Sequence, residues 1–109
     1  MTTFKETYEK AIVAIDTKLS KSKDMTILID TITLGMTTAV VKGEPTFAFE
    51  GLDAKDTKSN YGDVLWSIAQ KSNCSMTQVN SYVARYFEKQ GIVIQPHRDF
   101  LLFSIEGAL

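Results

Sequence analysis

The sequence predicts a single α+β domain, and three observations support this prediction. Residues 61–90 contain two helical patterns separated by a short break, residues 92–105 contain two apolar runs around a turn, and residues 3–21 carry one apolar helical stripe. Helical stripes and short apolar runs in separate parts of a chain are typical of helices packed on an antiparallel sheet. With 109 residues the chain can form one hydrophobic core, so we expect one domain over residues 1–109.

Composition and charge limit the classes of function that this chain can have. Hydrophobic residues make up 44% of the chain and charged residues 23%, as in ordinary globular domains. The net charge of −1 argues against a protein that coats nucleic acid by charge alone. Cys74 is the only cysteine and His97 the only histidine, so neither an intramolecular disulfide nor a structural zinc site is expected. No catalytic or phosphate-loop motif is present, and we predict no enzyme activity, no cofactor and no small-molecule substrate.

The N-terminus predicts neither a leader nor a membrane anchor. The first ten residues are polar and charged, and no run approaches the roughly 18 apolar residues that a membrane-spanning helix requires. We therefore expect a cytoplasmic protein that does not interact with membranes.

The first 51 residues predict one helix followed by strands. Thr2 or Thr3 can cap a helix over residues 3–21. Residues 25–42 are rich in Ile, Thr and Val, which favour pleated sheet, and Gly35 divides the run, so a hairpin is expected there. A helix over residues 25–34 is the alternative, because apolar side chains also recur there at i, i+3, i+4 and i+7. They are Met25, Leu28, Ile29 and Ile32.

A strand and a loop are predicted next. Residues 46–51 alternate Phe47 and Phe49 with smaller side chains, as in a half-buried strand that extends the C-terminal pair of strands. Residues 52–60 are polar and charged with no periodicity, so we expect a loop.

Two helices are predicted from residue 61 onward. Residues 61–72 place four apolar side chains on one helical face, namely Val64, Leu65, Ile68 and Ala69. Ser75 caps the second helix, with Gln78 completing a capping box, and Gly91 ends it. Its core side carries Val79, Tyr82, Val83, Tyr86 and Phe87. Trp66 and Tyr82 are expected to be core residues, because aromatics at helical spacing are usually core.

The spacing of these residues resembles the helix-turn-helix motif. With Leu65 as its first position, Ala69 occupies the small-residue site where the two helices touch, and Cys74 follows the turn as an apolar residue. Asn73 stands where glycine is usual, and Ser72 where an aliphatic residue is usual. The two strands that follow resemble a wing, so residues 61–105 resemble a winged helix-turn-helix domain.

This resemblance implies sequence-specific binding of double-stranded DNA by a small transcriptional regulator or by an accessory protein at a plasmid or phage DNA site. Cys74 to Phe87 contain no acidic residue, and the outward side of the second helix is polar. The predicted DNA contacts are Lys71, Ser75, Thr77, Gln78, Asn80, Ser81, Arg85, His97 and Arg98. A homodimer is expected, because one short helix reads only a few base pairs.

The alternative is a protein-interaction module of the same shape, for example a phage or mobile-element protein that binds a host complex. A polar helix face is also simply a solvated face, and the fold alone does not determine function.

Overall fold

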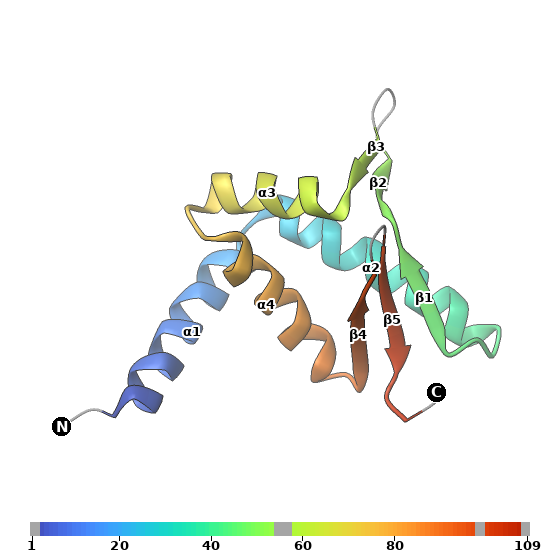
Figure 1. Cartoon of the computed structure of the whole chain (residues 1–109), viewed down its shortest axis with the longest axis horizontal. Coiled ribbons are helices and arrows are strands. Elements are labelled where there is room, and N and C mark those ends of the chain that lie inside the picture. The colour runs from blue at the N-terminus through green and yellow to red at the C-terminus, as the bar shows by residue number, and fades with distance from the viewer. Residues whose placement is uncertain (1–2, 54–57, 98–99, 108–109) are drawn as a thin grey trace.

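The computed structural model describes residues 3–53, 58–97 and 100–107 of the chain (Figure 1). Within these residues the chain is α+β, with four helices, a three-stranded antiparallel sheet and a two-stranded ribbon. In chain order the elements are α1 (Phe4–Ser20), α2 (Lys23–Val41), β1 (Thr46–Phe49), β2 (Gly51–Asp53), β3 (Lys58–Asn60), α3 (Tyr61–Ser72), α4 (Met76–Glu88), β4 (Ile92–Pro96) and β5 (Leu101–Ile105).

The three-stranded sheet joins the two halves of the chain. Its strand order is β1-β5-β4, with β5 in the centre and both neighbours antiparallel to it. Phe103 lies opposite Phe47 on one side and opposite Ile94 on the other. The strand predicted at residues 46–51 is therefore confirmed over Thr46–Phe49, and so is the expectation that it extends the C-terminal pair of strands.

The preferred prediction for residues 25–42 is wrong, because this run is the helix α2 and not a hairpin. The helix also extends past the alternative range of 25–34, at both ends. Its buried side follows a helical period through Met25, Leu28, Ile29, Ile32, Met36 and Ala39. Ser22 caps it by accepting a hydrogen bond from the Met25 N–H at 3.2 Å.

Threonine side chains explain why a run rich in β-branched residues is helical. The Oγ1 atoms of Thr26, Thr31 and Thr38 donate to carbonyls four residues earlier, at 3.1, 2.7 and 2.8 Å. These hydrogen bonds satisfy the hydroxyls inside the helix, in a rotamer that helical threonine allows. Threonine therefore gives no reliable signal for a strand here.

Gly35 is a packing residue and not a turn residue. It lies within α2, and a Cβ atom built on it would lie 2.3 to 2.6 Å from ring atoms of Phe47. Only glycine allows the Phe47 ring to approach the helix backbone so closely. The contact docks β1 onto α2.

The predicted loop at residues 52–60 also differs from the structure. Gly51–Asp53 and Lys58–Asn60 pair as an antiparallel ribbon, with Leu52 opposite Ser59. Residues 54–57 of that predicted loop lie outside the described residues.

One hydrophobic core joins α2, α3, α4 and the sheet. Its fully buried side chains include Leu28 and Ile32 of α2, Ile68 of α3, Val83 of α4 and Phe103 of β5. Contrary to expectation, α2 is long and apolar enough, by length and composition alone, to cross a membrane. Its buried stripe forms part of this core.

Trp66 and Tyr82, the two aromatic residues expected in the core, differ in their burial. The side chain of Trp66 is 58% exposed, because it lies on the outer side of α3, so that prediction is wrong. Tyr82 is half-buried and packs against the core from the edge.

α1 is anchored to the molecule near its C-terminal end. Its predicted helix is confirmed, and Thr3 caps it by accepting from the Glu6 N–H at 3.1 Å. Leu19 is fully buried, whereas Phe4 is 96% exposed and Tyr8 63% exposed on the same stripe. In Figure 1 the helix leads away from the other elements, with the N-terminus at its far end.

We predict that Gly35→Ala lowers the free energy of unfolding by about 1 to 3 kcal/mol, although alanine is the better helix former, because the methyl group overlaps the Phe47 ring. Thermal and urea unfolding followed by circular dichroism measure the change. Thr33→Ala, at an exposed position of the same helix, is the control and should change stability by no more than about 0.5 kcal/mol. Equal stability of the two variants would contradict the packing role of Gly35.

Candidate nucleic-acid interface

The turn between α3 and α4 is fixed by one residue and one cap. Asn73 has φ of 53°, the left-handed conformation that asparagine tolerates better than most residues. The Ser75 Oγ accepts from the Gln78 N–H at 3.1 Å, and the Gln78 Oε1 accepts from the Ser75 N–H at 2.8 Å. The predicted capping box is confirmed. Ser75 and Gln78, both predicted DNA contacts, therefore use these side-chain atoms to hold the start of α4.

The two outer flanks of α4 have different neighbours. Val79, Val83 and Phe87 are buried in the core. On one flank α1 lies alongside, and a small hollow of about 300 Å³ between the two helices is lined by Asp16, Thr17, Ser20, Tyr82, Arg85, Tyr86 and Lys89. The opposite flank carries Thr77 and Asn80, which are exposed, and Ser81 is half-buried on the ridge between Thr77 and Arg85.

Arg85 faces α1, whereas the sequence predicts this residue on the outward side of α4. Its Nη2 donates to the Asp16 Oδ1 at 2.5 Å, and the two side chains are 25% and 32% exposed. The Asp16 carboxylate offsets the charge of the guanidinium, so the pair attracts a phosphate less than a free arginine would. Arg85 therefore ties α4 to α1.

Tyr82 belongs to the same contact. Burial, with a smaller contribution from the Asp16 carboxylate, raises the pKa of the Tyr82 phenol. Tyr82 therefore stays neutral beside the ion pair at physiological pH.

Asn80 is oriented by a residue at the start of α3. The Tyr61 hydroxyl donates to the Asn80 Oδ1 at 3.0 Å, and the Tyr61 ring packs edge-on against Phe49 with 5.8 Å between centroids. Burial raises the pKa of Tyr61 well above its ordinary value, so the phenol remains a hydrogen-bond donor. The Asn80 amide is thus held in place with its NH₂ group available for another acceptor.

Lys71 lies at the end of α3 and not on the open flank of α4. Its Nζ forms an ion pair with the Asp24 Oδ2 of α2 at 2.9 Å, while the Lys71 side chain remains 68% exposed. The pair links the two helices across the surface.

The turn between β4 and β5 includes His97. The His97 N–H donates to the Phe100 carbonyl at 2.9 Å, and its ring stacks on Phe100 with 4.6 Å between centroids. The imidazole is exposed at this tip. Arg98, a further predicted contact, lies outside the described residues.

The structure thus divides the predicted contacts. Thr77 and Asn80 lie on one open flank, Ser81 is half-buried between Thr77 and Arg85, and Arg85, Lys71 and His97 lie elsewhere. Sequence reasoning did not identify Tyr61, whose aromatic ring and hydroxyl gave no signal beyond the start of a helix. Among residues 3–53, 58–97 and 100–107, no three His, Cys, Asp or Glu side chains come together as metal ligands could.

Comparisons with protein-family models, with curated proteins and with solved structures found no match to this chain.

We predict that Arg85→Glu lowers the free energy of unfolding by about 1 to 3 kcal/mol, because it places two carboxylates together where a charged hydrogen bond existed. Reversing the pair in the double variant Asp16→Arg, Arg85→Glu should recover a large part of that loss. Urea unfolding of the wild type, both single variants and the double variant gives the coupling energy. A double variant as unstable as the sum of the singles would show that the two side chains do not interact.

Proposed function

We propose that this chain binds double-stranded DNA sequence-specifically through α4, as a small transcriptional regulator or as an accessory protein at a plasmid or phage DNA site in the cytoplasm. The observation that carries the proposal is the arrangement of α2, β1, α3, α4, β4 and β5 around a sheet of order β1-β5-β4. This is the element order expected of a winged helix-turn-helix, in which α4 is the reading helix and the β4–β5 turn is the wing.

The open flank of α4 supports the proposal chemically. The Asn80 NH₂ group can donate at the edge of an adenine, and its Oδ1 keeps a second lone pair for a base donor beside the hydrogen bond from Tyr61. The hydroxyls of Thr77 and Ser81 can pair with bases or phosphates. The hydrogen bond from Tyr61 holds Asn80 before any DNA arrives, so less side-chain freedom is lost on binding. No acidic residue occurs in α4 before Glu88, so nothing earlier in the helix repels a phosphate backbone.

We expect wild-type protein to select a duplex sequence from a random pool and to bind it more tightly than unrelated duplexes. Asn80→Ala should weaken binding of the selected site by about 5- to 150-fold, because a bidentate base contact contributes about 1 to 3 kcal/mol of discrimination. Fluorescence anisotropy with labelled duplexes measures the affinities. Thr37→Ala, at an exposed position of α2 distant in sequence, serves as the control and should bind as wild type does. Absence of duplex binding at low salt would overturn the proposed function.

A homodimer formed through α1 is the second part of the proposal. The stripe of α1 that is buried at Leu19 continues to Tyr8 and Phe4, where no other part of the described chain covers it. The charges beside this exposed end are balanced, with Lys5 and Lys10 against Glu6 and Glu9, so two copies can approach without net repulsion. Two-fold pairing would present two α4 helices to two half-sites.

We predict a dimer in sedimentation velocity at micromolar concentration. The double variant Phe4→Glu, Tyr8→Glu should be a monomer, because it places charge on the apolar seam. Val13→Glu is the control, since Val13 is 65% exposed on the opposite side of α1, and it should remain a dimer. A wild type that is monomeric throughout, or a control that dissociates equally, would exclude this interface.

A protein-docking function is the second candidate, and the environment of Arg85 favours it. Because Asp16 holds Arg85, the described part of α4 offers DNA few free positive charges. Trp66 and Phe4 are large exposed apolar side chains of the kind that protein partners cover. This function becomes the better interpretation if the chain fails to bind duplex DNA at low salt.

A further inference from the structure

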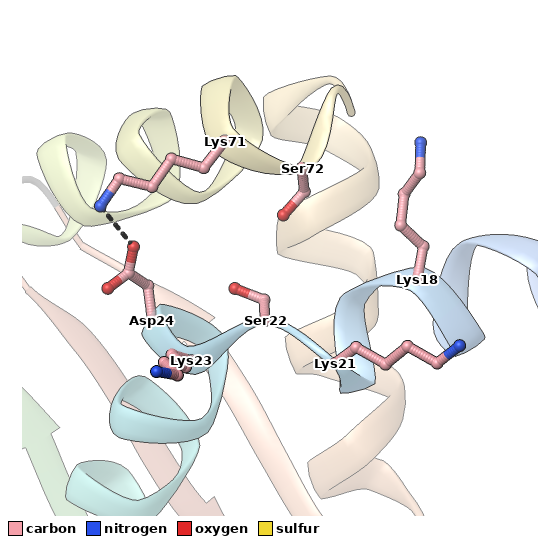
Figure 2. A pocket seen from close by; sticks show the side chains of 7 residues that line it. All are labelled: Lys18, Lys21, Ser22, Lys23, Asp24, Lys71 and Ser72. Atoms are coloured by element: carbon pink, nitrogen blue, oxygen red, sulfur yellow. Dashed lines mark hydrogen bonds and ion pairs between the residues drawn. The ribbon is translucent and has the colours of Figure 1, made fainter.

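A cluster of four lysines surrounds a hollow where α1, α2 and α3 meet (Figure 2). Lys18 and Lys21 come from the end of α1 and the turn after it, Lys23 from the start of α2, and Lys71 from the end of α3. The hollow has a volume of about 530 Å³ and opens to solvent. Figure 2 shows the hydroxyls of Ser22 and Ser72 facing each other between these helices. We call the four lysines, Lys18, Lys21, Lys23 and Lys71, the lysine cluster.

The lysine cluster concentrates positive charge in a chain whose net charge is −1. Asp24 is the carboxylate on its rim, and it pairs with Lys71 at 2.9 Å. In residues 3–53, 58–97 and 100–107, no carboxylate forms an ion pair with Lys21 or Lys23. Figure 2 shows the ammonium groups of the four lysines spread around the hollow, where an extended polyanion can contact several of them at once. The start of α2 adds the positive end of a helix dipole at the same place.

The lysine cluster lies next to the proposed reading helix. The Lys18 Nζ donates to the Asn73 carbonyl at 3.4 Å, and Asn73 forms the turn that leads into α4. An anion held over the hollow would therefore lie beside the first turn of α4. A DNA backbone is the extended anion that passes beside a helix lying in the major groove.

We propose that the lysine cluster binds the phosphate backbone of the same duplex that α4 reads, an inference that rests on the proposed function. Lysine ammonium groups on flexible stems suit phosphate contacts, which supply most of the affinity of protein–DNA complexes without reading sequence. The cluster takes the role that Arg85, held by Asp16, does not fill. Base discrimination then comes from α4, and backbone affinity from the α1–α2 turn and the end of α3.

The test compares the triple variant Lys18→Gln, Lys21→Gln, Lys23→Gln with the wild type in duplex binding at several salt concentrations. Lys71 is left unchanged, because its loss would leave Asp24 without its partner. We expect at least about a tenfold loss of affinity at low salt. The plot of log affinity against log salt should become shallower by about 2 to 3, since each phosphate contact contributes about 0.9 to the slope. The preference for the selected sequence should persist.

The matched control is Lys42→Gln, Lys58→Gln, Lys89→Gln, which removes the same charge outside the cluster and outside the exposed end of α1. Thermal unfolding establishes that both triple variants are folded. The control should keep most of the wild-type affinity and slope. Equal losses in the two variants would mean a general effect of net charge and would overturn the proposal.

The remaining outcomes separate this inference from the proposed function. If Asn80→Ala weakens binding while the triple variant keeps the wild-type affinity and slope, the lysine cluster is not a backbone contact and the proposed function stands. If the wild type binds no duplex at low salt, both proposals fail. Calorimetry tests whether the wild type binds inorganic pyrophosphate saturably. If the triple variant loses this binding but binds duplex DNA as the wild type does, the hollow is a site for a free phosphate compound and the proposed DNA contact is overturned.

Discussion

The contact between the Phe47 ring and the bare backbone of α2 at Gly35 determines how the sheet lies on the helices. Phe47 belongs to β1, β1 pairs with the central strand β5, and β5 pairs with β4. β4 follows α4 after a short turn at Gly91, where φ is 77°. The position of α4 is therefore linked through the sheet to the close contact between Phe47 and Gly35 of α2. A methyl group at that approach would move the strands, and the end of α4 with them.

Local signals in the sequence predicted most of the elements correctly. Caps and turn residues act over a few positions, so Thr3, Ser75, Asn73 and Gly91 could each be assigned from neighbouring residues. The hairpin predicted at residues 25–42 is wrong, because the β-branched composition favours a sheet while the apolar period, which also fits a helix, is the one that the core follows. The sequence does not reveal that threonine hydroxyls bond within the helix, or that a glycine faces an aromatic ring from a later strand.

The candidate site depended on contacts that no local pattern contains. Asp16 and Arg85 come from the first and fourth helices, and each looks like an ordinary solvated charge when its own helix is considered alone. The lysine cluster likewise combines three segments whose lysines are unremarkable one at a time. What the sequence did predict was the exposure of Thr77 and Asn80, since both positions follow from the helical period of the core side alone.

Because only the C-terminal end of α1 packs against the rest of the molecule, the local stability of this helix falls toward its N-terminal end. Near Leu19 and Asp16 the helix shares the cooperative unfolding of the core, so its amide hydrogens should exchange with solvent as slowly as those of the sheet. Toward Phe4 the helix depends on its own backbone hydrogen bonds and on the Thr3 cap, and a short helical segment without tertiary packing is only marginally stable in water. A partner that covers this end binds its helical form, so the free energy needed to order that end reduces the free energy of the association.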